Sequence, residues 1–185
     1  MAGDSRHTLT AEETSWCVAV RDALKAAGIA LPPEGGDFLL AQFAIVAKGD
    51  TDKALSRVKN YLKYVVGEFK YSTAAASASE VNGFMERKFP GIMVLLPDHD
   101  SHPHLSCNVK AYNPSSLQGE EFDMLFHEFL LIMEALTADL DDVRAGCIMS
   151  ASCKGLKWSH INMEVEKRMA VLYQDCFPIK FFSWP

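Results

Sequence analysis

The sequence lacks long apolar runs and an excess of positive charge. No uninterrupted apolar stretch approaches the roughly 20 residues that a membrane-spanning helix needs. The first ten residues have no apolar core of the kind found in a secretion signal, and Ala2 stands where a myristoylation signal has glycine. The formal net charge of -6 argues against general nucleic-acid binding. We therefore expect a cytoplasmic protein that does not bind nucleic acid.

Paired cysteines and catalytic motifs are also missing. The five cysteines are scattered without a CxxC pair, so we expect reduced, mostly buried thiols: Cys17, Cys107, Cys147, Cys153 and Cys176. The chain has no glycine-rich phosphate loop, nucleophile elbow or HExxH. An enzyme would have to recruit Cys153 or Cys176 with His160 or His127. We expect no catalytic residues, and this thiol chemistry stays as the alternative.

A histidine- and aspartate-rich turn raises the question of a metal site. Asp98, His99, Asp100, His102 and His104 are ligand types that metals use, but they crowd into one turn. Turn composition alone accounts for the Asp, Ser and Pro residues there. We therefore expect no metal.

Helical spacing dominates the first 70 residues. Thr10 precedes two acidic residues suited to a first helical turn. Apolar residues then recur at helical intervals over 11–27, 38–47 and 52–66, with Gly28 and Gly49 at the breaks. A run of Ser, Thr and Ala over 72–79 follows, so we place a helical N-terminal region at 1–73 and a second domain at 74–185.

The second domain alternates strands and helices. We predict strands over 92–96 and 105–112, an amphipathic helix over 120–136 and an acidic loop over 139–142. Another strand over 147–150, a helix over 163–173 stopped by Pro178, and a last strand over 179–184 follow. A parallel strand pair needs such a helical crossover. The predicted fold class is α/β, with an N-terminal helical cap and an incomplete mixed or parallel sheet flanked by helices.

Several motifs, in order, resemble the CRAL-TRIO lipid-transfer family, in its α-tocopherol and retinaldehyde branch. They are Asp37-Phe38-Leu39-Leu40, Lys48-Gly49-Asp50, Lys59-Asn60-Tyr61-Leu62, the hairpin around Pro97-Asp98 and Val109–Pro114, the strand and turn at Gly146–Gly155 with Ser159-His160, and Gln174-Asp175-Cys176-Phe177-Pro178-Ile179-Lys180. The family continues past the strand at Phe181-Phe182, so the resemblance implies a C-terminally truncated lipid domain.

The resemblance implies non-catalytic binding and transfer of a small hydrophobic lipid of tocopherol, retinoid or phosphoinositide type, with a lipid ligand in place of a cofactor. It implies a lipid lining made by Phe126, Phe129, Met133, Cys147, Met149, Ala151, Met169, Leu172, Tyr173, Phe181 and Trp184. It also implies a phosphoinositide headgroup site at Lys180 and Lys48, and transient peripheral membrane contact.

Truncation suggests a second hypothesis of another class. A sheet that stops at its last strand leaves an unpaired edge, which favours pairing with another chain. The alternative is therefore a non-transferring paralogue that acts as a protein-interaction module or has lost its function, and that self-associates through the sheet edge.

Overall fold

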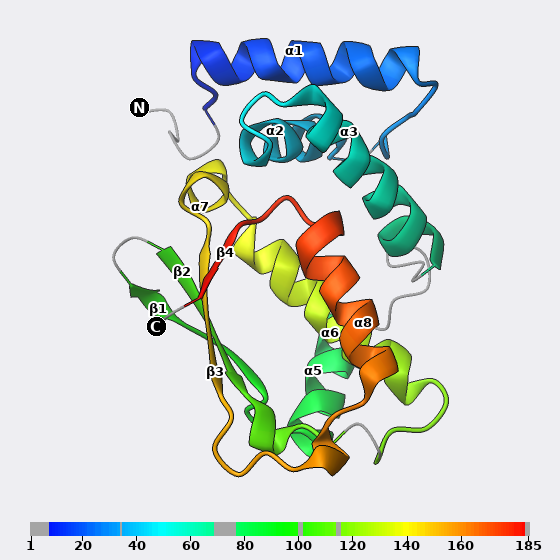
Figure 1. Ribbon diagram of the computed structural model, residues 1–185, viewed down its shortest axis with the longest axis vertical. Helices are drawn as coiled ribbons and strands as arrows, with labels where there is room; N and C mark the ends of the chain where they lie inside the picture. The colour runs from blue at the N-terminus through cyan, green and yellow to red at the C-terminus, as the bar shows by residue number, and fades with distance from the viewer. Residues whose placement is uncertain (1–7, 34, 69–76, 100–101, 114–115, 184–185) are drawn as a thin grey trace.

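A computed structural model describes residues 8–33, 35–68, 77–99, 102–113 and 116–183 (Figure 1). The elements, in chain order, are α1 (Ala11–Ala26), α2 (Gly36–Val46), α3 (Thr51–Asn60), the π-helix η2 (Tyr61–Glu68), α5 (Ala78–Lys88), β1 (Met93–His99), β2 (His102–Asn108), the 3₁₀-helix η3 (Val109–Ala111), α6 (Glu121–Leu136), α7 (Leu140–Ala145), β3 (Cys147–Ser152), the 3₁₀-helix η5 (Trp158–His160), α8 (Met163–Val171), the π-helix η6 (Leu172–Cys176) and β4 (Phe181–Ser183).

Capping hydrogen bonds set the start of the first helix, and a glycine follows its end. The Thr10 hydroxyl accepts from the Glu13 amide, and the Glu13 carboxylate accepts from the Thr10 amide, which satisfies two free donors at the N-terminus of α1. Gly28 follows the helix with φ of +66°, a conformation that glycine adopts at little cost. The predicted limits of this helix are confirmed within a residue.

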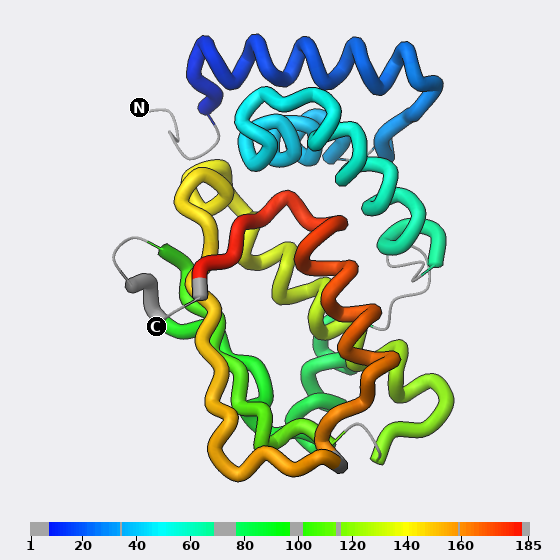
Figure 2. Tube along the Cα trace, viewed as in Figure 1, coloured from blue at the N-terminus to red at the C-terminus, as the bar shows by residue number. Residues whose placement is uncertain are grey.

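The sheet has the mixed topology that the sequence predicts. Its strand order is β1-β2-β3-β4. β1 pairs antiparallel with β2, while β2 with β3 and β3 with β4 are parallel. Figure 2 traces the chain from β3 around the end farthest from α1, then through α8 and back to β4. The mixed α/β class with flanking helices is thereby confirmed.

Helices α5, α6 and α8 lie beside the sheet and share one core with it (Figure 1). Phe126 and Met133 of α6 are fully buried, and Leu105 of β2 and Cys147 of β3 contribute from the sheet. Each buried side chain of this size contributes roughly 1.5–3 kcal/mol relative to an exposed one. The wide apolar face of α6 is therefore the face that is buried in this core.

One predicted loop is a helix. The acidic segment over 139–142 begins α7, because the Asp139 side chain accepts from the Asp142 amide at 2.9 Å and caps the first turn. Asp141 and Asp142 then occupy the first turn, where negative charge is favourable. The acidic composition marks a helix start and not a loop.

Several boundaries also differ from the prediction. β1 extends to His99 and β2 begins at His102, over residues predicted to lie between the strands. β2 ends at Asn108, because the chain turns into η3 over residues predicted as strand. The predicted helices over 52–66 and 163–173 each change from α to π geometry, at Tyr61 and Leu172. β4 begins at Phe181 and not at Ile179, and its predicted end at Trp184 lies outside the described residues.

A second apolar cluster holds the N-terminal helices together. It joins residues of α1, α2 and α3 with Leu140 and Val143 of α7. The predicted boundary between residues 73 and 74 lies outside the described part of the chain. Among the described helices, none is both long and apolar enough to cross a membrane.

Candidate functional site: an apolar cleft between the two cores

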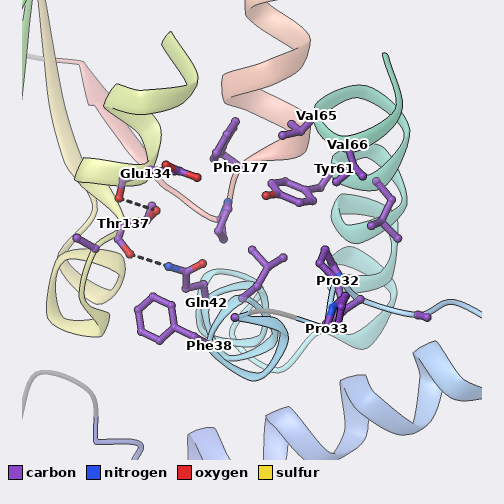
Figure 3. A pocket seen from close by; sticks show the side chains of 17 residues that line it. Pro32, Pro33, Phe38, Gln42, Tyr61, Val65, Val66, Glu134, Thr137 and Phe177 are labelled. Carbon is purple, nitrogen blue, oxygen red and sulfur yellow. Dashed lines mark hydrogen bonds between the residues drawn. The ribbon is translucent and has the colours of Figure 1, made fainter. Parts of the chain in front are cut away.

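An apolar cleft of about 800 Å³ opens where the N-terminal helices meet the α/β part (Figure 3). Small-molecule sites commonly have volumes of about 300–1,000 Å³. The apolar walls come from the connection before α2, from α2, from η2 and from the segment after η6: Ala30, Leu31, Pro32, Pro33, Phe38, Leu39, Leu62, Val65, Val66, Phe177 and Pro178. The site therefore joins segments that are distant in sequence.

Two buried polar residues form one wall. The Gln42 side-chain amide donates to the Thr137 carbonyl oxygen at 2.6 Å, and the Thr137 hydroxyl donates to the Met133 carbonyl oxygen at 2.9 Å. Both side chains are buried. Buried polar groups without partners are costly, so these bonds hold the end of α6 against α2.

Tyr61 and Glu134 bring further polar groups to the cleft. In Figure 3 the Tyr61 hydroxyl and the Glu134 side chain lie on opposite sides of the cleft. Burial raises the pKa of Tyr61, and the negative charge of Glu134 raises it further. Tyr61 is therefore a neutral hydroxyl at physiological pH, able to donate or accept a hydrogen bond.

The two π-helical segments meet beside this site. η2 packs against η6, and the Tyr61 ring lies edge-on to Phe43 and to Phe177, with centroid distances of 5.8 Å in both pairs. Edge-to-face pairs contribute roughly 0.5–1.5 kcal/mol beyond their burial. Widened π turns are frequent at functional sites; here η2 carries four cleft residues, and η6 leads directly into Phe177 and Pro178.

The predicted lipid-lining residues gather elsewhere. Most of them belong to, or pack against, the core between the sheet and α6 and α8: Phe126, Phe129, Met133, Cys147, Met149, Met169, Leu172, Tyr173 and Phe181. Ala151 is exposed near the end of β3, and Trp184 lies outside the described residues. None of the described residues among them lines the cleft.

The predicted headgroup lysines do come together. Lys180, just before β4, is half-buried, and its pKa is lowered first by burial and then by the positive charges of Lys48 and Arg57. Arg57 donates to the Phe177 carbonyl oxygen at 2.7 Å. Within the described ranges, no carboxylate forms an ion pair with Lys48 or Lys180. The negative charge of Asp175 acts on Arg57. We call Lys48, Arg57 and Lys180 the cationic cluster; an anion beside Lys180 would relieve the repulsion that lowers its pKa.

The thiols whose pKa is raised by burial do not resemble nucleophiles. Burial raises the pKa of Cys176 to about 12 and those of Cys107 and Cys147 to about 11. Reactive cysteines need a lowered pKa and solvent access. Cys153 is exposed.

The histidines of the predicted turn have other contacts. His102 packs edge-on against Phe182 with a centroid distance of 5.7 Å, and Nε2 of His104 lies 2.8 Å from the Ser150 hydroxyl. The described residues contain no convergent group of three metal-ligating side chains. The side chains of Asp98 and His99, and residue Asp100, lie outside the described part.

One feature of the sequence points to a polar contact at the wall of the cleft. Gln42 is the only polar residue between Phe38 and Ala47. A helix that is apolar on all sides is buried on all sides, so a single glutamine within it needs an internal partner. That partner, Thr137, could not be identified from sequence spacing.

The chain matches no protein-family model and no curated protein.

Proposed function

We propose that this protein binds a small hydrophobic lipid in the cleft and carries it between membranes without catalysing a reaction. The cleft carries the proposal, because it combines about 800 Å³ of space with mostly apolar walls and few polar groups. Such a composition is typical of sites that hold a small apolar molecule and orient it by a few hydrogen bonds. Binding of this kind needs no nucleophile.

The polar groups favour one kind of lipid. Tyr61 offers a hydroxyl and Glu134 an acceptor, so a ligand hydroxyl finds both a donor and an acceptor. A fatty-acid carboxylate would meet the negative charge of Glu134 at the wall of the cleft, which is unfavourable. We therefore favour a neutral lipid alcohol over a free fatty acid.

The cationic cluster supports a second ligand contact. Lys48, Arg57 and Lys180 lie close enough for their charges to lower the pKa of Lys180. Phosphate groups bind to such clusters through charge-assisted hydrogen bonds. We expect Lys180→Gln to weaken binding of a soluble inositol polyphosphate several-fold in calorimetry, while Lys25→Gln, which alters an exposed lysine at the end of α1, leaves it unchanged.

A cavity-filling pair of variants tests the cleft. Val66 lines the cleft and belongs to neither apolar core, so Val66→Trp places a large ring in the cleft with little disturbance of packing. Val18→Trp adds the same ring on the exposed face of α1, where Val18 is 50% exposed. The measurement is displacement of a fluorescent lipid alcohol by long-chain alcohols and by fatty acids.

Wild type and Val18→Trp should bind the probe equally, and Val66→Trp should bind at least about ten-fold more weakly, since loss of a buried apolar contact of this size is worth roughly 1.5–3 kcal/mol. Equal binding by Val66→Trp, with unchanged thermal stability, would contradict the cleft as the lipid site.

A further inference from the structure

The most exposed large apolar side chain among the described residues lies far from the cleft. Trp158, in η5, is 88% exposed, and Met163 at the start of α8 is 62% exposed. Leu156 adds a third partly exposed apolar side chain in the same turn. In Figure 1 this segment between β3 and α8 forms the end of the molecule opposite α1. We call Leu156, Trp158 and Met163 the tryptophan turn.

Lysines surround the tryptophan turn. Lys154 and Lys157 are exposed within it, and the side chain of Lys110 lies beside Gly155. No ion pair links these three lysines to a carboxylate in the described ranges. The exposed acidic residue closest in sequence to these lysines is Glu164, in the first turn of α8. Its backbone N–H donates to the Asn162 side chain. The turn is therefore locally positive on a chain with a net charge of -6.

From this combination we propose that the tryptophan turn docks the protein onto an anionic bilayer surface. Tryptophan is enriched at membrane–water interfaces, where its amphipathic ring lies at the level of the lipid headgroups, with its apolar body toward the lipid and its N–H toward water. Lysine stems reach along the interface and keep their charge at the lipid phosphates. Because the rest of the chain is acidic, repulsion from the bilayer orients this end toward the membrane.

The docking surface supplies the membrane contact that the proposed lipid exchange needs, and in that respect it rests on the proposed function. Its test is separate, because it uses empty vesicles and leaves the cleft unchanged. The tryptophan turn also lies at the end of the α/β part away from the cationic cluster, in which Lys48 follows α2, Arg57 belongs to α3 and Lys180 follows η6 (Figure 1). The two sites can therefore be altered independently.

Vesicle flotation measures the docking directly. The full chain is mixed with vesicles of phosphatidylcholine alone or with about a third phosphatidylserine. Trp158→Ala should lower partitioning onto the anionic vesicles by roughly ten-fold or more, since it removes the largest apolar anchor. The double variant Lys154→Gln/Lys157→Gln should lower it by about thirty-fold, because each lysine near an anionic surface contributes about 1 kcal/mol.

Val18→Ala provides the matched control, because it removes an exposed apolar side chain at the other end of the molecule. It should float like wild type. Trp158 is almost fully exposed, so its loss should leave the melting temperature unchanged and any loss of flotation is not due to unfolding. The proposal is overturned if wild type does not float with anionic vesicles, or if Trp158→Ala floats equally well. It is also overturned if flotation does not depend on phosphatidylserine.

Discussion

At the scale of single residues, the packing of the N-terminal helices depends on one glycine. Gly49 has φ of +76°, and a Cβ atom there would lie 2.5 Å from Cδ1 of Trp16. No residue other than glycine meets both requirements, since the left-handed conformation and the close ring each exclude a side chain. Trp16 thus packs on the turn between α2 and α3.

Gly49→Ala should reduce the free energy of unfolding by about 3 kcal/mol, through backbone strain and displacement of the Trp16 ring. Gly28→Ala is the matched control, because Gly28 has φ of +66° but no atom within 4 Å of the added Cβ. It should cost only about 1 kcal/mol. Urea denaturation of both variants measures the difference; equal losses would show that the Trp16 contact has no effect.

At the scale of elements, sequence patterns predicted those structures whose signals are local. The capping residues Thr10 and Glu13 located the start of α1, and apolar spacing located α6. The prediction of a loop over 139–142 is wrong, because acidic residues favour loops and first helical turns alike. The chain changes to π geometry at Tyr61 and Leu172, in two segments that pack against each other, and no local pattern predicts either change.

The cap of α7 gives a test at this scale. Asp139→Ala removes the acceptor for the Asp142 amide and should lower stability by about 1 kcal/mol. Asp139→Asn keeps an acceptor oxygen but removes the charge, so it should recover most of the loss. Thermal denaturation distinguishes the two, and an Asn variant as unstable as the Ala variant would contradict the capping role.

At the scale of the whole molecule, an ion pair fastens α1 to α7. Arg144 donates from Nε to Oε1 of Glu13 and from Nη2 to Oε2, both at 2.8 Å. The Arg144 guanidinium holds the pKa of Glu13 at about 2, below its ordinary value. The Glu13 side chain is 8% exposed, so the pair is only weakly screened by solvent.

This pair predicts a pH dependence. A carboxylate whose pKa is lowered by folding stabilises the folded state above its unfolded pKa, and that contribution is lost as the pH falls toward the folded pKa. Between about pH 6 and pH 3 the wild type should lose roughly 2 kcal/mol more stability than Glu13→Gln. Urea denaturation across this range measures it, and parallel pH profiles would contradict the shifted pKa.

The cleft depends on the tertiary arrangement of the whole molecule, so local sequence patterns do not predict it. Tyr61, Gln42 and Phe177 come from segments whose proximity depends on the tertiary fold. Gln42 alone carries a sequence signal, as the single polar residue of an apolar helix, and that signal does not identify its neighbours in the cleft. The headgroup site at Lys48 and Lys180 stays a prediction from the family resemblance; the positive charge of Lys48 lowers the pKa of Lys180, so the two side chains are within electrostatic reach.

Native mass spectrometry of the purified chain, with lipid extraction from the same sample, tests the central claim most directly. The proposed function predicts one neutral lipid alcohol per chain in wild type and in Val18→Trp, and its loss in Val66→Trp. A wild-type chain that carries no lipid after exposure to membranes, or a Val66→Trp variant that carries the same lipid at the same stoichiometry, would contradict the cleft as a lipid site.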